Sequence, residues 1–240
     1  MTFKQRIGAW LFVHLPITRF LFDQLRVEVN AAAIGAANNV IPARRKRIQE
    51  FRQRRDLYVN VACGPHVAEG MLNIDLFPAA PSVLAWDCRW TLPVSDGGAA
   101  GIRIEQFVEH LETREELPSL LRDCHRALKP NGVLRIIVPD AERYLQAYCR
   151  GDLEGFRELN VSDPWPADLP TRMDFINHVF HQWHEHRWAY DFETLAHRVR
   201  SAGFDRVEKK CFRQSIDPVL ACDREVHAPY SLYVDAIKSL

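Results

Sequence analysis

The stretch that decides the fold is LYVNVACGPHVAEGMLNID, residues 57–75, which predicts two β-strands separated by a tight turn. Residues 57–62 are mostly apolar and rich in β-forming side chains, and Cys63-Gly64-Pro65 has the composition of a turn. From Leu72 to Leu76 apolar and polar residues alternate, as in a second strand, and Asp75 stands near its end. The segment therefore predicts a strand–loop–strand unit of an α/β sheet.

A loop of this kind lies at the carboxyl ends of strands, where nucleotide-like ligands bind in open α/β sheets. Gly64 lets the backbone approach a ligand closely, because glycine has no side chain. The carboxylate of Asp75, at the end of the second strand, can accept hydrogen bonds from both hydroxyls of a ribose. Together these two features predict a cofactor that contains a nucleoside.

The same residues resemble the motifs of a known enzyme family. Residues 61–65, VACGP, look like the first motif of the class I S-adenosylmethionine-dependent methyltransferases, and residues 73–76, NIDL, look like their second. Later motifs follow in the same order and at similar spacing, namely Trp86-Asp87, Glu109-His110-Leu111 and Leu128-Lys129-Pro130-Asn131-Gly132. In this ordered set of motifs the chain resembles a group of small predicted methyltransferases often associated with surface-polysaccharide synthesis.

The resemblance implies a doubly wound α/β fold, with a Rossmann-like sheet of seven mostly parallel strands whose final strand is antiparallel. Strands and helices alternate after residue 57, which independently favours a parallel sheet covered by helices. We expect strands at Leu57–Ala62, Leu72–Leu76, Val83–Trp86, Gly101–Glu105, Val133–Val138, Arg206–Phe212 and Ser231–Ile237. Helical spacing predicts one helix over 117–128 and another that Asp191 caps and Gly203 ends.

The resemblance also assigns roles along the carboxyl edge of the sheet. Asp75 would bind the ribose and Asp87 the adenine amine, while the backbone at Cys63 and Gly64 would meet the methionine part of the cofactor. The cofactor-binding set that it implies is Ala62, Cys63, Gly64, Pro65, Asp75, Leu76, Asp87, Cys88, Glu105 and Gln106. His110 and His186 are the catalytic candidates, because a neutral histidine can take the proton of an acceptor hydroxyl. The alternative for His110 is a structural histidine that is hydrogen-bonded to the next loop.

The chain departs from the family pattern at several positions. Asn60 replaces the usual acidic residue, Ala62 replaces the first glycine, and His66 stands near the missing third glycine. Alanine fits at position 62 only if the backbone keeps a negative φ or the ligand leaves room for the methyl group. Gln106 stands where this group usually has a histidine.

Charge is unevenly distributed, although the formal net charge of the 240 residues is zero. Residues 1–56 contain 11 Lys and Arg against 4 acidic residues, whereas the remainder contains 20 against 27. We expect residues 1–56 to form a basic, amphipathic helical extension ahead of a methyltransferase domain over residues 57–240. This extension either makes peripheral contact with an anionic membrane surface or packs as a lid on the domain or on another subunit. The sequence leaves the oligomeric state open.

The six cysteines are scattered and include no Cys-x-x-Cys pair, as in a reduced, cytoplasmic protein. No apolar run reaches the roughly 20 residues of a membrane-spanning helix, so membrane contact is expected only at the inner face, through residues 1–56. Residues 7–13 resemble the apolar part of a secretory signal, but His14 and Pro16 interrupt the pattern and we expect no signal peptide. No nucleic-acid partner is expected.

Residues 148–190 form an irregular, aromatic-rich insertion after the fifth predicted strand, a natural cover for an acceptor site. The spacing of His178, His181, His184 and His186 within it invites a metal site. No signature of carboxylate and histidine completes such a site, so we expect no metal and assign these histidines to the wall of a polar pocket.

These features predict methyl transfer from S-adenosylmethionine to a small-molecule or glycan acceptor, at a hydroxyl of a sugar or glycolipid. A nicotinamide-dependent oxidoreductase is an alternative, but Ala62, Gly64 and Val67 do not supply its Gly-x-Gly-x-x-Gly turn. A non-catalytic scaffold of methyltransferase fold in glycan assembly is the other alternative, because the first motif is altered. An enzyme should bind S-adenosylmethionine and its demethylated product, whereas a scaffold need bind neither.

Overall fold

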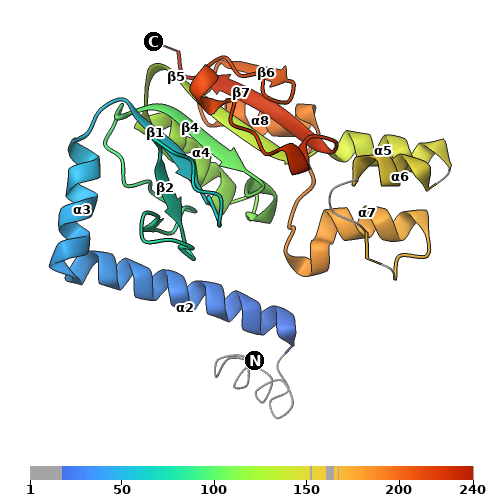
Figure 1. The fold of residues 1–240 in the computed structure, drawn as a ribbon, viewed down its shortest axis with the longest axis horizontal. Coiled ribbons are helices and arrows are strands. Elements are labelled where there is room, and N and C mark those ends of the chain that lie inside the picture. The colour runs from blue at the N-terminus through green and yellow to red at the C-terminus, as the bar shows by residue number, and fades with distance from the viewer. Residues whose placement is uncertain (1–17, 152, 161–164, 167, 240) are drawn as a thin grey trace.

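A seven-stranded sheet lies at the centre of the computed structural model, which describes residues 18–151, 153–160, 165–166 and 168–239 (Figure 1). The strands are β1 Leu57–Val61, β2 Leu72–Asp75, β3 Leu84–Ala85, β4 Ala99–Glu105, β5 Leu128–Pro139, β6 Arg206–Lys210 and β7 Ser231–Ile237. Their spatial order is β3-β2-β1-β4-β5-β7-β6, and β7 alone runs antiparallel to its neighbours. The predicted Rossmann-like sheet of seven mostly parallel strands is confirmed, together with its reversed final strand.

The central strands were recognisable in the sequence because they are buried on both faces. Every residue of β4 is buried, and β1 pairs with it in parallel from Tyr58↔Gly101 to Val61↔Ile104. Strands covered on both faces have nearly continuous apolar sequences. Since β1 to β5 are parallel, their carboxyl ends meet at one edge of the sheet, and the loops that follow them share this edge.

The fifth strand begins earlier than its apolar pattern indicated. Residues 128–132, which the sequence assigns to the motif before the strand, already pair with β4 at Ala99↔Leu128. The register then shifts before Gly101↔Val133, and Asn131 adopts a positive φ of 61° in the irregular segment. A polar, turn-like segment thus belongs to the sheet because its backbone is paired, which side-chain periodicity does not reveal.

Both predicted helices are present and pack on the sheet. Helix α4, Glu116–Ala127, contacts β5, and α8, Phe192–Ser201, contacts β6 and β7. The side chain of Asp191 caps α8 by accepting a hydrogen bond from Thr194 N at 2.8 Å. Gly203, with a φ of 106°, follows the end of the helix, as predicted.

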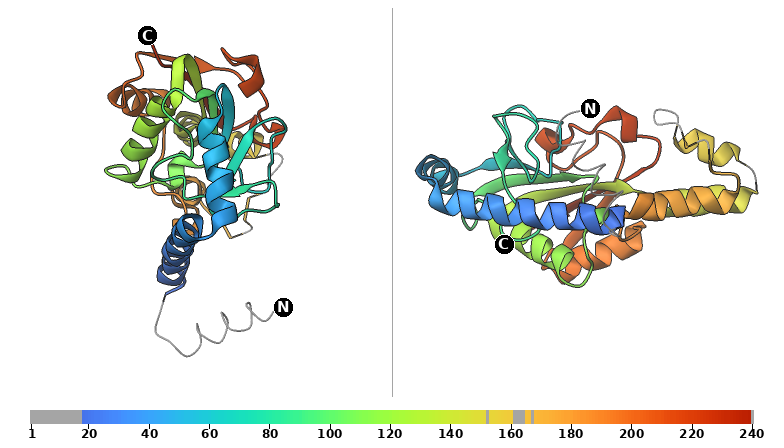
Figure 2. Two further views of the ribbon diagram at one scale, coloured as in Figure 1. Left: turned by 90° about the vertical axis from the view of Figure 1, so that its left-hand side faces the viewer. Right: turned by 90° about the horizontal axis from the view of Figure 1, so that it is seen from below.

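Two N-terminal helices precede the sheet and pack against it, which confirms the helical character of the described part of the extension. Figure 2 shows α2, Arg19–Val40, running along the molecule before the chain turns into α3, Pro42–Gln53. Ile48 of α3 is only 5% exposed and belongs to the core of the sheet. Two asparagines of α2, Asn30 and Asn38, donate hydrogen bonds of 2.9 Å to backbone carbonyls that follow β2 and end β3.

One side of α2 remains apolar and exposed. Leu21, Leu25 and Val29 follow at intervals of four residues and are 48%, 49% and 67% exposed. Among the described residues, no helix combines the length and the apolar character needed to cross a bilayer. Membrane contact of the extension stays a prediction. The apolar residues 7–13 and the interruptions at His14 and Pro16 belong to residues 1–17, which lie outside the described part of the chain.

The connection from β1 to β2, residues 62–71, contains no helix. Two asparagines hold it instead. Asn60 Nδ2 donates to Asn73 Oδ1 at 2.9 Å and to the carbonyl of His66 at 3.0 Å. Asn73 in turn binds both backbone groups of Ala68 at 2.8 Å. The uncharged Asn60, where the family usually has an acid, is therefore explained by its bonds to the loop.

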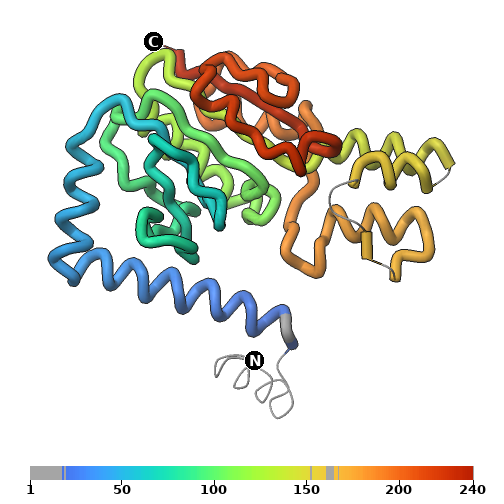
Figure 3. Tube along the Cα trace, viewed as in Figure 1, coloured from blue at the N-terminus to red at the C-terminus, as the bar shows by residue number. Residues whose placement is uncertain are grey.

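The aromatic-rich insertion folds as a small helical unit beyond the end of the sheet, seen at the right of the tube in Figure 3. It follows α5, Ala141–Arg150, and contains α6 Glu154–Leu159, α7 Arg172–His181 and the 3-10 turn η2 Gln182–His184. Its buried residues form a second core, namely Tyr144, Ala147, Phe156, Phe175 and Ile176. Aromatic residues of the insertion thus pack in this second core. The predicted role of the insertion as a cover of the acceptor site stays a prediction.

Candidate active site

The loop after β1 and the end of β2 meet at the carboxyl edge of the sheet. Gly64 N donates a hydrogen bond to Asp75 Oδ2 at 2.8 Å, and Phe77 N donates to Asp75 Oδ1 at 2.6 Å. Gly64 has a positive φ of 53°, and a Cβ built there would meet no atom within 4 Å. The structure thus brings Gly64 and Asp75 together beside open space, as a cofactor loop requires.

Ala62 adopts a left-handed backbone conformation that favours glycine. Its φ is 51°, so the condition of a negative φ, under which alanine would fit without strain, is not met. The next residue, Cys63, is buried and Pro65 is exposed. Burial and then the charge of Asp75 raise the pKa of Cys63 to about 11, so its thiol stays protonated at neutral pH and is not a nucleophile.

We expect Ala62→Gly to raise the free energy of unfolding by about 1 kcal/mol, because glycine adopts positive φ without the steric cost that alanine incurs. Urea unfolding of both proteins measures the difference. Ala33→Gly is the matched control, since Ala33 is an exposed residue inside α2 and should lose about 1 kcal/mol on substitution. A loss of stability in both variants would contradict strain at Ala62.

Asp87 and Cys88, the residues assigned to adenine, follow β3, and the carboxylate of Asp87 already binds an arginine. Arg89 donates to both oxygens of Asp87, with Nε 3.0 Å from Oδ1 and Nη2 2.8 Å from Oδ2. The same guanidinium pairs with Glu28 of α2 and Glu116 of α4. An adenine amine would therefore share the Asp87 carboxylate with Arg89. Cys88 is buried in the core.

Glu105 and Gln106, at the end of β4, are engaged inside the protein. Glu105 pairs with Arg103 and lies 3.1 Å from Nδ1 of His227, which ends the 3-10 turn η4, Glu225–His227. Burial works to raise the pKa of Glu105, but the His227 bond and the Arg103 charge outweigh it and hold this pKa below its ordinary value. Gln106 Nε2 donates to Ser231 Oγ at 3.0 Å.

His110 and His186 come together although 75 residues separate His110 from its bonding partner Glu185. The two rings lie edge to face, with centroids 4.8 Å apart. His110 Nδ1 lies 2.9 Å from the carbonyl of Glu185, and His186 Nδ1 lies 2.6 Å from the carbonyl of Val179. His110 thus forms the hydrogen bond to a following loop that a structural histidine would make, and its ring also contacts that of His186. Burial lowers the pKa of both histidines, to about 4 for His186, so both are neutral at neutral pH.

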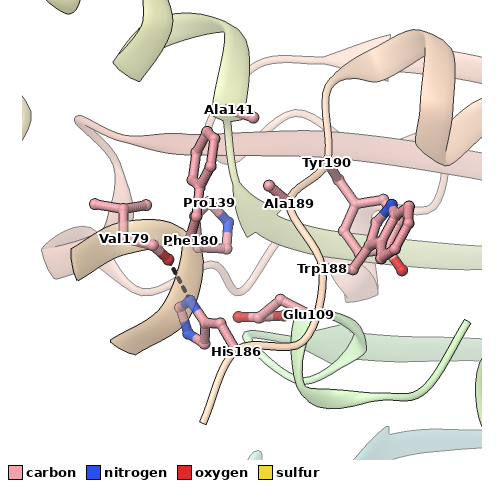
Figure 4. A pocket seen from close by; sticks show the side chains of 9 residues that line it. All are labelled: Glu109, Pro139, Ala141, Val179, Phe180, His186, Trp188, Ala189 and Tyr190. Atoms are coloured by element: carbon pink, nitrogen blue, oxygen red, sulfur yellow. Dashed lines mark hydrogen bonds between the residues drawn. The ribbon is translucent and has the colours of Figure 1, made fainter. Parts of the chain in front are cut away.

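Glu109 lies beside His186 in a small pocket (Figure 4). Its side chain is 2% exposed, and neither carboxylate oxygen has a hydrogen-bond partner among the described residues. Burial raises the pKa of Glu109 to about 8. The pocket has room for about one water molecule, about 10 Å³. It is lined by Glu109, Pro139, Ala141, Val179, Phe180, His186, Trp188, Ala189 and Tyr190.

Of the four histidines between residues 178 and 186, His186 alone lines this pocket. Helix α7 ends at His181, so helical spacing does not bring His184 onto the same face. His181 and His184 are exposed, and the ring of His178 packs near Trp165 and Trp183. The sequence analysis missed Glu109 as a site residue. The sequence feature that could have identified it is the pair of adjacent ionisable residues, Glu109-His110, shortly after the buried strand β4.

A larger and more open hollow of about 440 Å³ lies between the N-terminal helices and residues 78–85. Arg44 and Arg47 of α3 line it, and Gly64 and Asp75 do not. We therefore do not assign it to the predicted cofactor.

No protein-family model matches this sequence, and no curated protein matches it. Among solved structures, one that aligns is an S-adenosylmethionine-dependent methyltransferase from Archaeoglobus fulgidus, at 16% identity and a TM-score of 0.46, over 87% of this chain and 94% of that one. A methyltransferase from Thermotoga maritima, described as a possible histamine N-methyltransferase, aligns at 15% identity and a TM-score of 0.46, over 99% and 96%.

Phosphoethanolamine N-methyltransferase 2 of Haemonchus contortus, in complex with S-adenosylmethionine, aligns at 11% identity and a TM-score of 0.46. The alignment covers 94% of this chain and 61% of that one. The structural neighbours of this chain thus include S-adenosylmethionine-dependent methyltransferases. Similarity of this degree does not assign an activity or a substrate to the chain.

Proposed function

We propose that this chain binds S-adenosylmethionine at the carboxyl edge of its sheet and transfers the methyl group to a hydroxyl of a sugar or glycolipid. The observation that supports the proposal best is the meeting of Gly64 and Asp75, 2.8 Å apart, at the carboxyl ends of adjacent parallel strands. This is where a nucleoside cofactor binds in open α/β sheets.

The cofactor half of the site consists of the loop 62–65 and Asp75. The ribose hydroxyls donate to Asp75, which now accepts from the backbone at Gly64 and Phe77. Cofactor binding would share or replace these two bonds, and the open space beside Gly64 admits the methionine part. Leu76 and Cys88 would flank the adenine, and Asp87 would bind its amine in competition with Arg89.

The acceptor half consists of Glu109, His110 and His186. Glu109 and His110 follow β4, which lies next to β1 in the sheet, and His186 contacts His110 from the segment after α7. The two halves therefore lie at one edge of the sheet. In the reaction the acceptor oxygen attacks the methyl carbon, the carbon–sulfur bond breaks, and its electron pair remains on sulfur. The hydroxyl proton passes to the unprotonated ring nitrogen of His110 or His186, both of which are neutral at neutral pH. Alignment of donor and acceptor supplies much of the rate.

The sugar acceptor is the finer part of the proposal. It is supported by the resemblance in sequence and by aromatic and histidine side chains near the acceptor half, such as Trp188, which is 43% exposed. Flat aromatic faces suit sugar rings. The competing scaffold function predicts that the chain binds neither the cofactor nor its demethylated product.

Titration calorimetry with S-adenosylmethionine and S-adenosylhomocysteine tests the cofactor half, and we expect both to bind. Radiolabelled cofactor offered with nucleotide sugars, lipid-linked glycans and a cell lysate tests the acceptor. Label in a glycan supports the proposal, whereas label only in protein or nucleic acid overturns the sugar assignment. Failure of both ligands to bind overturns the enzyme and leaves the scaffold.

We expect His186→Ala to lower the turnover of methyl transfer by about 100-fold, the scale of general acid–base assistance. Binding of S-adenosylmethionine should be nearly unchanged, because His186 belongs to the acceptor half. The matched control is His197→Ala, at an exposed position of α8. Equal turnover of the two variants would remove His186 from the reaction.

A further inference from the structure

Three groups with metal-binding chemistry converge where the loop after β4 meets the segment after α7. Glu109, His110 and His186 each offer one ligand-capable atom, and these atoms all lie within 4.8 Å of one another. Glu109 and His186 are 2% and 8% exposed. His110 is half-buried, so the cluster is mostly shielded from solvent, unlike a group of acidic side chains on a surface.

The hydrogen bonds of the two histidines determine what they present to one another. A backbone carbonyl can only accept a hydrogen bond, so Nδ1 of His110 and Nδ1 of His186 each carry the proton. In a neutral imidazole the other nitrogen, Nε2, then carries a lone pair and no hydrogen. Backbone carbonyls that fix the tautomer in this way are the usual outer partners of metal-ligating histidines.

The carboxylate of Glu109 makes the cluster electron-rich. Both of its oxygens are buried and lack a hydrogen-bond partner among the described residues. Neither neutral ring offers it an N–H from Nδ1, because these are committed to Glu185 and Val179. An isolated buried carboxylate is strongly unfavourable. It must therefore take up either a proton or a cation.

We infer that Glu109, His110 and His186 form a binding site for one divalent transition-metal ion. One carboxylate and two imidazoles are a donor set that holds zinc and iron(II) in proteins. Magnesium and calcium are excluded by this choice of donors, since they prefer oxygen ligands. Tyr190 lines the same pocket, and its buried hydroxyl also lacks a hydrogen-bond partner among the described residues.

The backbone holds the ligands in place. Arg187 N and Trp188 N both donate to the carbonyl of Glu109, at 2.8 and 3.2 Å, which ties the segment of His186 to the turn of Glu109 and His110. Ligand atoms lie about 2.0–2.2 Å from zinc, so atoms within 4.8 Å of one another need side-chain movements on the order of 1 Å to share an ion. The sequence predicted no metal site. The site proposed here shares only His186 with the histidines whose spacing suggested one.

Binding of the ion does not depend on the proposed methyl transfer. One consequence does rest on that function: with the ion bound, His110 and His186 act as ligands and not as bases, and an acceptor hydroxyl bound to the cation would lose its proton to solvent more readily. The two ideas are therefore tested by separate measurements. Metal content and metal affinity test the metal site, whereas binding of S-adenosylmethionine tests the proposed methyl transfer.

The test uses the full chain, stripped with a chelator and titrated with zinc and, for its visible absorption, cobalt. We expect one ion per chain and a cobalt spectrum typical of nitrogen and oxygen ligands. Glu109→Gln, which keeps the shape of the side chain, and His186→Ala should each weaken the affinity at least tenfold. The matched controls are Glu185→Gln and His181→Ala, both at exposed side chains, and they should bind as the unmodified chain does.

Three results would overturn the site. These are no stoichiometric binding of either metal, equal loss in the control variants, and unchanged affinity in Glu109→Gln. Circular dichroism verifies folding, and His110→Ala replaces His186→Ala if that variant does not fold. A chain that binds S-adenosylmethionine but no metal refutes this inference alone, whereas a chain that binds metal but no cofactor refutes only the proposed function.

Discussion

Replacement of Arg135 by alanine is expected to lower the free energy of unfolding by about 3–5 kcal/mol. Arg135 lies in the middle of β5 and is 0% exposed. Its Nε and Nη2 bind both oxygens of Asp223 at 2.8 and 2.6 Å, and its Nη1 binds Asp235 of β7 at 2.7 Å. Both carboxylates are also fully buried. Alanine would leave two buried negative charges without their cation.

The surroundings of Arg135 leave these charges little freedom to relax. Asp235 Oδ2 is fixed by Ser215 Oγ and Ile216 N, at 2.8 and 2.7 Å, and Asp223 Oδ2 by Arg213 N at 2.7 Å. Burial alone would lower the pKa of Arg135, but the two carboxylates outweigh it and raise this pKa, so the guanidinium is charged. The network joins the two strands to the loop between β6 and β7.

Urea unfolding at neutral pH measures the effect. The matched control is Arg150→Ala, because Arg150 makes an ion pair of 2.8 Å with Glu158 in which both side chains are more than half exposed, at 55% and 58%. Its removal should change stability by no more than about 1 kcal/mol. Arg135→Lys serves if the alanine variant does not fold, since lysine keeps the charge but not the paired bonds to Asp223. Equal stability of the Arg135 and Arg150 variants would contradict the prediction.

Asp75→Ala is expected to weaken binding of S-adenosylmethionine by roughly 1–3 kcal/mol, the scale of a lost hydrogen bond to a charged group, which is about 5- to 150-fold in Kd. Two ribose hydroxyls lose their acceptor, and Gly64 N loses the bond that positions the loop. Titration calorimetry measures the change, and the demethylated product should be affected equally because it contains the same ribose.

Two further variants separate ribose binding from loop positioning. Asp75→Asn retains one oxygen that can accept from Gly64 N, so the loop should hold while ribose binding weakens. Asp96→Ala removes a carboxylate whose side chain is 84% exposed and should leave the affinity unchanged. If Asp75→Ala binds both ligands as tightly as the unmodified chain, Asp75 is not a cofactor residue.

The sequence determined the sheet and its order of elements. The predicted strands Leu57–Ala62 and Gly101–Glu105 correspond to β1 and β4, whose bounds in the structure differ by one or two residues. Helix α8 could be bounded because Asp191 and Gly203 are local signals at its two ends. The sequence also predicted that Gly64 and Asp75 belong to one site at the carboxyl ends of the strands, and in the structure Gly64 N donates a hydrogen bond to Asp75 there. Each of these inferences depends on neighbours in the chain or on the period of a strand.

Only the tertiary structure decided which charged groups are already engaged and which are not. Arg103 and Glu105 lie two residues apart on one face of β4, so their ion pair is local. By contrast, the bond of Glu105 to His227 and the ion pairs of Arg89 with Glu28 and Glu116 join segments far apart in the sequence. Likewise, the histidine spacing after residue 178 indicated a cluster along one helix. The structure instead joins His186 to Glu109 and His110, because the helix ends at His181 and the following backbone bonds to Glu109. Contacts between such distant segments depend on how the helices and strands pack together. The hydrophobic pattern of the sequence indicates only which side chains of each element can be buried.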